Sequence, residues 1–106
     1  MRGKLYLVTR RDLPPGQQAV QAAHALRELA ARHPAVDRAW YEVSRTLVWL
    51  AVADESALRA LQGEAALRGV PAAPHHEPDH GGALGAIALG PEGANLVRRI
   101  PLALTA

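Results

Sequence analysis

The chain has no cysteine and no phenylalanine, and Lys4 is its single lysine. The absence of cysteine excludes a disulfide framework, a thiolate nucleophile and a zinc site with sulfur ligands. No apolar run approaches the ~20 residues that a membrane-spanning helix requires. The N-terminus also lacks the layout of a signal peptide. We therefore expect a cytoplasmic protein that has no membrane segment.

The composition is typical of one small globular domain. A chain of 106 residues suffices for one domain and not for two, so we expect a single domain over residues 1–106. Hydrophobic residues make up 49% of the chain but aromatic residues only 4%, so the core has to be built mainly from Ala, Leu and Val. The formal net charge is +2, and the positive charge is almost wholly arginine. Arginine suits phosphate recognition, although a bias toward Ala, Leu and Arg also follows from a GC-rich coding sequence.

The stretch from Leu13 to Ala31 predicts the helix around which the chain is organised. Pro14 and Pro15 favour a helix entry, so the helix should begin near Gly16 or Gln17. Its expected apolar face consists of Ala19, Ala22, Ala23, Ala25, Leu26, Leu29 and Ala30. Because alanine has little bulk, a neighbouring element can approach this helix closely.

A polar stripe is predicted along the same helix. Gln17, Gln21, His24 and Glu28 follow one another at spacings of four, three and four residues, which places them on one side of the helix. His24 is a candidate functional residue because an imidazole changes its charge near neutral pH. The alternative is a solvated histidine that pairs with Glu28.

Two arginines lie between the first predicted strand and this helix. Arg10 and Arg11 directly follow the apolar strand expected over residues 4–9. The first amide groups of a helix are unpaired and attract anions, so the two guanidinium groups predict a phosphate-binding position. Solvated charges at the end of a strand are the alternative.

The rest of the chain predicts alternating helices and strands. They comprise a short helix over 35–44, a strand over 45–53, a helix over 54–68, a strand over 83–89 and a closing helix over 90–99. A strand, helix, strand connection implies a parallel crossover, so the 45–53 strand should lie beside the first. The apolar tail after residue 99 should dock on the sheet edge. We therefore predict the α/β class, as a three-layer α/β/α sandwich with about four strands.

The segment His75-His76-Glu77-Pro78-Asp79-His80 gathers five ionisable or metal-capable groups. Imidazoles and carboxylates can bind zinc. However, adjacent side chains on an extended segment point to opposite faces, and the spacing matches no helical zinc motif.

Two other uses of this segment remain open. In one, Glu77 or Asp79 faces the groove bordered by His24, and the carboxylate and the imidazole together activate a water molecule. In the other, Pro78 and the following glycines make a solvated turn that the carboxylates cap.

The order of these segments resembles the type 2 peptidyl-tRNA hydrolase family over nearly the whole chain. In that family an apolar strand ends in Arg-x-Asp-Leu, and a Gly-Lys-rich turn leads into a helix that reads Ala-Ala-Gln-Cys-Ala-His-Ala. The corresponding residues here are Arg10–Leu13, residues 14–17 and Ala19–Ala25. The late Leu-Gly-Ile-Gly-Pro block of the family is echoed by Ile87–Pro91.

The resemblance implies an α/β/α fold with a mixed four-stranded sheet, commonly in a homodimer. It also implies hydrolysis of the ester that joins a peptide to the 3′ end of tRNA, without a metal or other cofactor. The family's histidine corresponds to His24 and its helix glutamine to Gln21. Its acidic residue, within an Asp-Ala-Gly turn, corresponds best to Asp79, with Glu77 nearly as good. We thus expect catalytic roles for His24, Asp79 and Glu77. The residues expected to bind the substrate, peptidyl-tRNA, are Gln17, Gln21, Arg10 and Arg11.

Two departures from the family pattern leave three hypotheses. Gln17 stands where the family has a lysine, and the Arg-Thr pair that follows the family's acidic turn has no counterpart in the shorter loop here. The first hypothesis is an RNA-ester hydrolase. The second is a catalytically inactive binding module for tRNA or a protein. The third is a metal-dependent hydrolase built on the histidine-rich segment.

Overall fold

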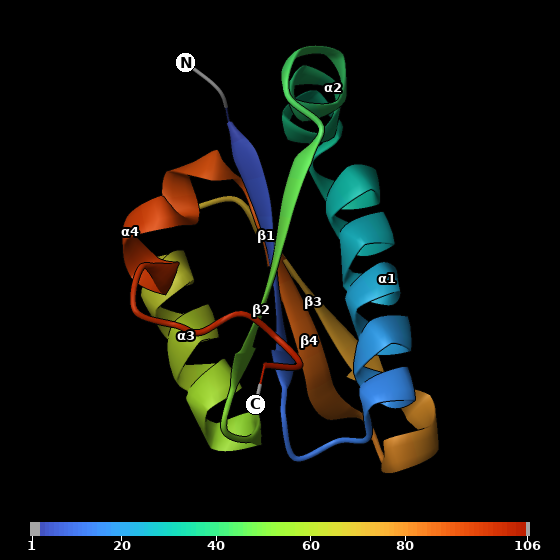
Figure 1. Cartoon of the computed structure of the whole chain (residues 1–106). Coiled ribbons are helices and arrows are strands. Elements are labelled where there is room, and N and C mark those ends of the chain that lie inside the picture. Colours follow the sequence, from blue (N-terminus) through green and yellow to red (C-terminus); the bar gives the residue numbers. More distant parts are fainter. Residues whose placement is uncertain (1–2, 106) are drawn as a thin grey trace.

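A four-stranded mixed sheet forms the middle layer of the computed structural model, which describes residues 3–105 (Figure 1). Its strands, in the spatial order β2-β1-β4-β3, are β1 (Lys4–Arg10), β2 (Thr46–Val52), β3 (Ala72–Glu77) and β4 (Ala83–Leu89). β1 and β2 are parallel, as the crossover predicts, whereas β4 is antiparallel to both of its neighbours. The predicted fold class is confirmed.

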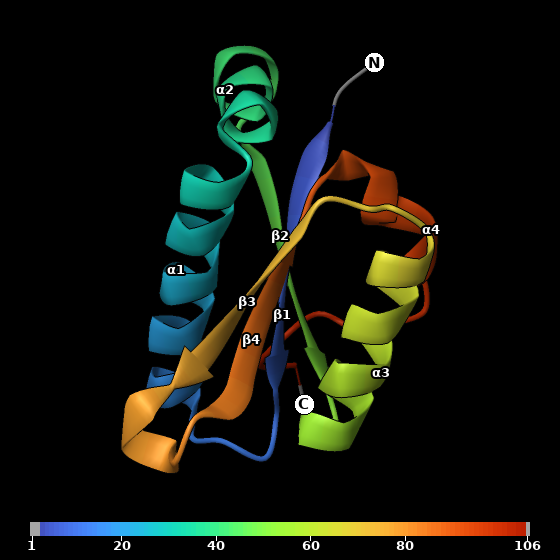
Figure 2. The ribbon, with the colours of Figure 1, turned by 180° about the vertical axis from the view of Figure 1, so that it is seen from behind.

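Helices cover both faces of the sheet. α1 (Pro15–Arg32) and α2 (Pro34–Val43) lie on one side, and α3 (Glu55–Leu67) and α4 (Ala94–Val97) lie on the other, as Figures 1 and 2 show from opposite directions. The predicted closing helix is shorter than expected, because residues 91–93 form a 3-10 turn and only 94–97 are α-helical. Within residues 3–105, no helix is both long enough and apolar enough to cross a membrane.

β1 is buried on both faces because its apolar side chains alternate between the two helical layers. Leu5 and Leu7 pack in the cluster that contains Ala22, Ala25 and Leu29 of α1. Val8 packs in the cluster on the α3 side. The α1 cluster is completed by small side chains of the sheet, namely Ala73, Ala86 and Ala88. The close approach of α1 that its alanines predict is therefore matched by alanines on the strands beneath it.

The buried face of α1 differs from the predicted one. Gln18 and Gln21 are buried, whereas Ala19 and Ala23 are exposed. Gln18 is drawn inward by Thr9, whose hydroxyl donates to Gln18 Oε1 at 3.0 Å, and its Nε2 donates to the Leu13 carbonyl at 2.8 Å. Because both the oxygen and the nitrogen of this side-chain amide are hydrogen-bonded, these bonds offset the cost of removing the amide from water. The helix is therefore rotated relative to the orientation that its alanines alone predict.

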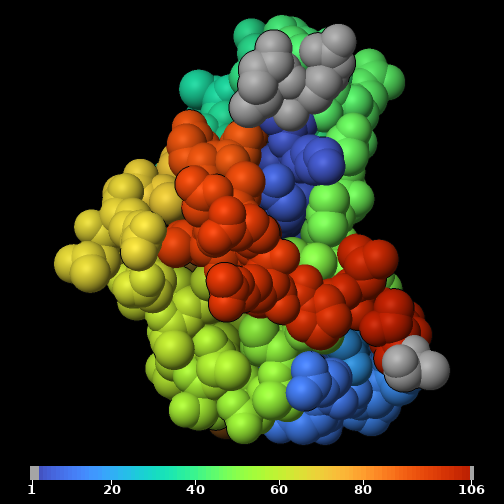
Figure 3. Space-filling model, turned by 60° about the vertical axis from the view of Figure 1, so that its left-hand side comes forward, coloured from blue at the N-terminus to red at the C-terminus, as the bar shows by residue number. Residues whose placement is uncertain are grey.

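The C-terminal segment pairs with the outer edge of β2, as the sequence predicts. The Ala51 N–H donates to the Pro101 carbonyl at 3.1 Å, and the Ala103 N–H donates to the Trp49 carbonyl at 2.9 Å. Leu102 forms an antiparallel bridge with Leu50. Figure 3 shows this segment in red, lying across the surface of the molecule.

Candidate active site

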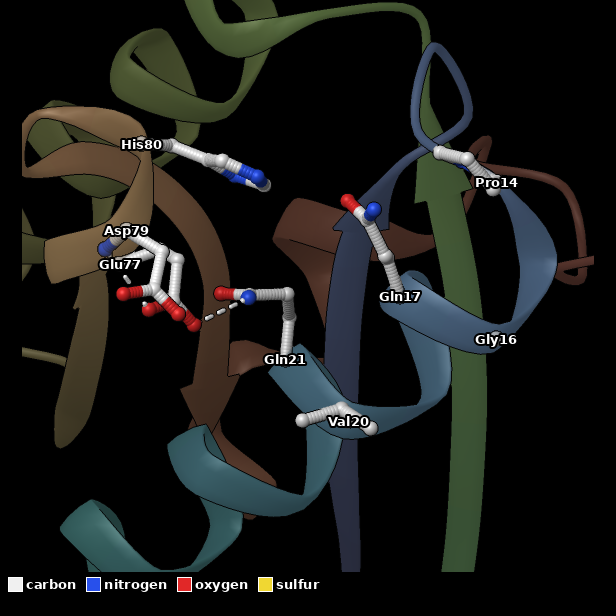
Figure 4. A pocket seen from close by; sticks show the side chains of 8 residues that line it. All are labelled: Pro14, Gly16, Gln17, Val20, Gln21, Glu77, Asp79 and His80. Carbon is white, nitrogen blue, oxygen red and sulfur yellow. Dashed lines mark hydrogen bonds between the residues drawn. The ribbon is translucent and has the colours of Figure 1, made fainter.

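A cleft of about 510 Å³ lies between the start of α1 and the turn that joins β3 to β4 (Figure 4). The helix side of the cleft is lined by Pro14, Gly16, Gln17, Val20 and Gln21, and the turn side by Glu77, Asp79 and His80. Of the polar stripe predicted on α1, Gln17 and Gln21 line the cleft, whereas His24 and Glu28 do not. The turn that faces it carries three ionisable side chains within four residues.

Two contacts join α1 to β3 beside this cleft. Gln21 Nε2 donates to Glu77 Oε1 at 2.7 Å, and the His24 ring stacks on the His75 ring with centroids 4.3 Å apart and planes 8° apart. The two contacts can form side by side because Gln21 and His24 are neighbours on the helix surface and His75 and Glu77 point to the same face of the strand. These four side chains form what we call the α1–β3 array.

Gly85 provides the space in which Gln21 lies. His75 pairs with Ala86 while His76 pairs with Leu84, so β4 has one extra residue, Gly85, at this point. A Cβ atom at position 85 would overlap the side-chain amide of Gln21. Gln21 is only 3% exposed, so its side chain is held in this position by its surroundings. A larger residue at position 85 would therefore displace the Gln21 side chain that reaches Glu77.

We expect Gly85→Ala to lower the free energy of unfolding by about 1–3 kcal/mol, because the added methyl group overpacks a closed site. Urea denaturation measures this change. Gly63→Ala is the matched control, since position 63 lies inside α3 and an added Cβ atom there would meet no other atom within 4 Å. That control should raise the stability by about 0.5–1 kcal/mol through helix propensity. Equal stability of Gly85→Ala and the wild type would contradict the assignment.

Glu77 is the fixed carboxylate of the cleft. Besides the Gln21 bond, its Oε2 accepts the backbone N–H of Asp79 at 3.2 Å. The hydrogen bond from Gln21, followed by that from Asp79 and the nearby His75, holds the pKa of Glu77 below its ordinary value of 4.5. Glu77 is therefore ionised at neutral pH. Asp79, in contrast, is exposed, and its carboxylate accepts no hydrogen bond from any residue in the range 3–105.

We expect Gln21→Leu to raise the pKa of Glu77 toward its ordinary value, because it removes the largest cause of the lowering. Titration of the Glu77 carboxyl carbon by NMR measures this pKa, and Gln17→Leu, on the cleft rim, should leave it unchanged. Since the pKa of Glu77 is lowered on folding, its ionised form stabilises the fold above pH 4.5. That stabilisation should disappear as the pH falls through the lowered pKa. If the pKa of Glu77 is the same in Gln21→Leu as in the wild type, the hydrogen bond from Gln21 is not what lowers it.

His24 does not contact a carboxylate directly. It is exposed, lies one helical turn beyond Gln21 and stacks on His75. Glu77 instead approaches His75, with 3.6 Å between His75 Nε2 and Glu77 Oε1. Glu77 and Asp79 both line the cleft, as one use of this segment predicts, but within residues 3–105 neither carboxylate is paired directly with His24. His75, on the same face of β3 as Glu77, contacts both the His24 ring and the Glu77 carboxylate.

The two arginines lie away from the cleft. Arg10 binds Asp12 through Nε and Nη2 at 2.9 and 2.8 Å and the Leu84 carbonyl at 3.3 Å. This pairing also holds the pKa of Asp12 below its ordinary value. Arg11 is exposed and borders a separate hollow beside Gln18 and the C-terminal segment. Arg10 thus links the loop before α1 to β4. At the expected phosphate position, its guanidinium group is already paired with the Asp12 carboxylate.

His75 and His80 are metal-capable residues in the sequence, but neither is among the site residues predicted from it. His80 lines the cleft, and in Figure 4 its imidazole extends from the turn toward α1. The two-residue spacing from buried Ala73 could have placed His75 and Glu77 on the α1 face. In the part of the chain that the structure describes, no three His, Cys, Asp or Glu side chains converge in a way that could hold a metal ion. The donor geometry therefore gives no support to the metal-dependent hypothesis.

Comparison with known proteins agrees with the family resemblance. The family described as "Peptidyl-tRNA hydrolase PTH2" matches residues 3–105. A solved structure of a protein of unknown function from Agrobacterium tumefaciens strain C58 is 16% identical, with a TM-score of 0.71 over 96% of this chain and 98% of that one. At this identity the likeness shows the fold alone, and no curated protein matches the sequence. The family match extends over all of the described residues, and the chain therefore belongs to the peptidyl-tRNA hydrolase PTH2 family.

Proposed function

We propose that this protein hydrolyses the ester bond of peptidyl-tRNA, or of another N-blocked aminoacyl-tRNA, with water activated by its own side chains. Family membership supports a peptidyl-tRNA hydrolase-like function. The proposed hydrolysis itself rests on one observation. In the cleft, Gln21 is held by Glu77 and lies beside the Asp79 carboxylate, which accepts no hydrogen bond from the described residues. His80 on the turn side of the cleft and His24, one helical turn beyond Gln21 on α1, are the imidazoles proposed to transfer protons.

In the proposed reaction, Asp79 orients a water molecule toward the carbonyl carbon of the ester, and His24 takes a proton from that water as it attacks. The bond between the carbonyl carbon and the ribose oxygen then breaks. His80, on the opposite wall of the cleft from α1, gives a proton to the departing ribose oxygen. The products are a free carboxylic acid and a tRNA with an intact terminal hydroxyl group, and exchange with solvent restores both imidazoles.

The remaining site residues bind and orient the substrate in this proposal. Gln21 donates through Nε2 to Glu77, while its Oε1 is buried against Gly85, so in this proposal its amide holds the Glu77 carboxylate at the wall of the cleft. Gln17 lies at the exposed first turn of α1 and contributes a second amide. Of the two arginines, Arg11 has the guanidinium that is available to a phosphate outside the cleft, because Arg10 is bound to Asp12.

Release of the acyl group from N-acetylaminoacyl-tRNA by the purified protein, in the presence of a chelator, tests the proposal. The expected products are the N-acetylamino acid and a tRNA that can be aminoacylated again. The inactive binding module predicts a different result, namely bound tRNA without release and an affinity that falls steeply with salt. A folded protein that releases no acyl group would overturn the hydrolase proposal.

We also propose a homodimer, located where tRNA is used, in the cytoplasm. Three apolar side chains are exposed in α2 and at the start of β2: Tyr41 at 55%, Val43 at 64% and Leu47 at 42%. α2 buries none of its residues fully, which leaves this surface free to pack against a second copy. Light scattering after gel filtration should give twice the 11.3 kDa of the chain, and Val43→Glu should return it to the monomer mass.

A further inference from the structure

We propose that His75 is a positioning residue that fixes the His24 ring by stacking on it and is itself held in place by Glu77. The kinetic part of this inference rests on the proposed function, whereas the contact between the rings does not. The His75 ring is largely buried, with 13% of the side chain exposed, and the reaction proposed above does not use it.

His24 needs such a support. It is an exposed residue on the surface of α1, and an exposed side chain samples several rotamers. Neither nitrogen of its ring has a hydrogen-bond partner between residues 3 and 105. The contact that restrains it is the near-parallel stack on His75, at 4.3 Å between centroids. Because a proton acceptor must be held in the geometry of attack, this restraint bears directly on catalysis.

His75 is in turn backed by a rigid group. Its Nε2 is buried and has no hydrogen-bond partner in the described chain, and it lies 3.6 Å from Glu77 Oε1. Glu77 is fixed by Gln21 at 2.7 Å and by the Asp79 backbone at 3.2 Å. Support therefore passes from Glu77 to His75 and from His75 to His24.

A role in packing alone does not explain an imidazole at this position. A phenylalanine or leucine would fill the same space without placing a polar nitrogen where it has no partner, which is costly. The attraction between this nitrogen and the Glu77 carboxylate accounts for the imidazole, since it holds the ring in the plane that stacks on His24. In this way a buried ring orients an exposed one.

NMR spectra of the histidine ring protons test the contact in the free protein. In the wild type, the ring current of His75 should shift the His24 signals upfield. His75→Leu, which fills the space without an aromatic ring, should return them to the position of an exposed histidine, whereas His75→Phe, which keeps a ring but loses the attraction to Glu77, should keep only part of the shift. The matched control, His76→Ala, removes the exposed neighbouring imidazole and should change nothing. Unchanged His24 signals in His75→Leu would overturn the proposal.

Kinetics with N-acetylaminoacyl-tRNA separate positioning from substrate binding. His75→Leu should lower kcat by roughly 10- to 100-fold with little change in KM, as expected for a misplaced catalytic group. His75→Phe should recover only part of this loss, because Glu77 does not hold its ring, and His76→Ala should be unaffected. A rise in KM at constant kcat would overturn the positioning role in favour of substrate binding. A wild-type protein without activity would refute the proposed function, and the ring-proton spectra would then decide the positioning question alone.

Discussion

His24→Ala is expected to lower kcat for N-acetylaminoacyl-tRNA by roughly 100- to 10,000-fold, the range that removal of a general base produces. The variant keeps the helix, because alanine is the best helix former and His24 is exposed. It also keeps the bond between Gln21 and Glu77, which does not involve His24. The loss should therefore fall on the chemical step and not on the fold or on substrate affinity.

Single-turnover kinetics at saturating enzyme measure this loss without interference from product release. The dissociation constant for an uncleavable amide analogue of the substrate should remain close to that of the wild type. His76→Ala, which removes another exposed imidazole, provides the control for a general effect of lost histidine. If His24→Ala retains full activity, the general base is another group, and Asp79 becomes the first candidate.

His80→Ala is expected to lower kcat for the same substrate by a comparable factor of roughly 100 to 10,000, but for a different reason. In the proposed reaction His80 protonates the ribose oxygen as it leaves. An activated aryl ester of the same N-acetylamino acid has a leaving group that needs no proton. Its hydrolysis should therefore be slowed far less by His80→Ala.

The pair of variants makes this test specific. His24→Ala should slow the tRNA ester and the aryl ester alike, since both require attack by water. Comparison of the two substrates in both variants therefore gives a pattern that loss of folding or of tRNA binding cannot produce. Equal slowing of both esters by His80→Ala would show that His80 supports the turn or the substrate and does not act as an acid.

Much of the fold could be predicted from hydrophobic patterns because they reflect local burial. β1 and β2 read as continuous apolar runs, and Asp54 could be recognised as an N-cap, where its side chain accepts the Ala57 N–H at 3.0 Å. β3 was harder to recognise because it contains Pro74 and polar residues. It is an outer strand in the observed order, and an outer strand tolerates proline because one side of it needs no hydrogen bonds.

Burial of polar residues could not be predicted in the same way, because it depends on partners distant in sequence. Gln18 is buried against Thr9, which also accepts a hydrogen bond from the Trp49 indole at 2.9 Å. Gln21 is buried against Glu77, 56 residues away. No periodicity of α1 contains this information, so the alanines predicted a face that is rotated from the observed one.

The sequence predicted that the candidate residues lie near one another but not which contacts each of them makes. The resemblance favoured Asp79 only slightly over Glu77, and the two are distinguished by the hydrogen bonds from Gln21 and a backbone amide to Glu77. Which imidazole approaches the carboxylate depends on how α1 lies along β3, and that alignment is set by the bulge at Gly85. The pairing of Arg10 with Asp12, in contrast, is local and could have been expected from their spacing of two residues.

The pairing of residues 101–103 with β2 has a consequence for the behaviour of the protein at high concentration. An outer strand without a partner presents amide and carbonyl groups that recruit strands from other molecules. Here the groups of Trp49 and Ala51 are occupied by the protein's own tail. Proteolytic removal of that tail should leave the cleft intact and expose this edge, so insoluble aggregates should appear before hydrolytic activity is lost.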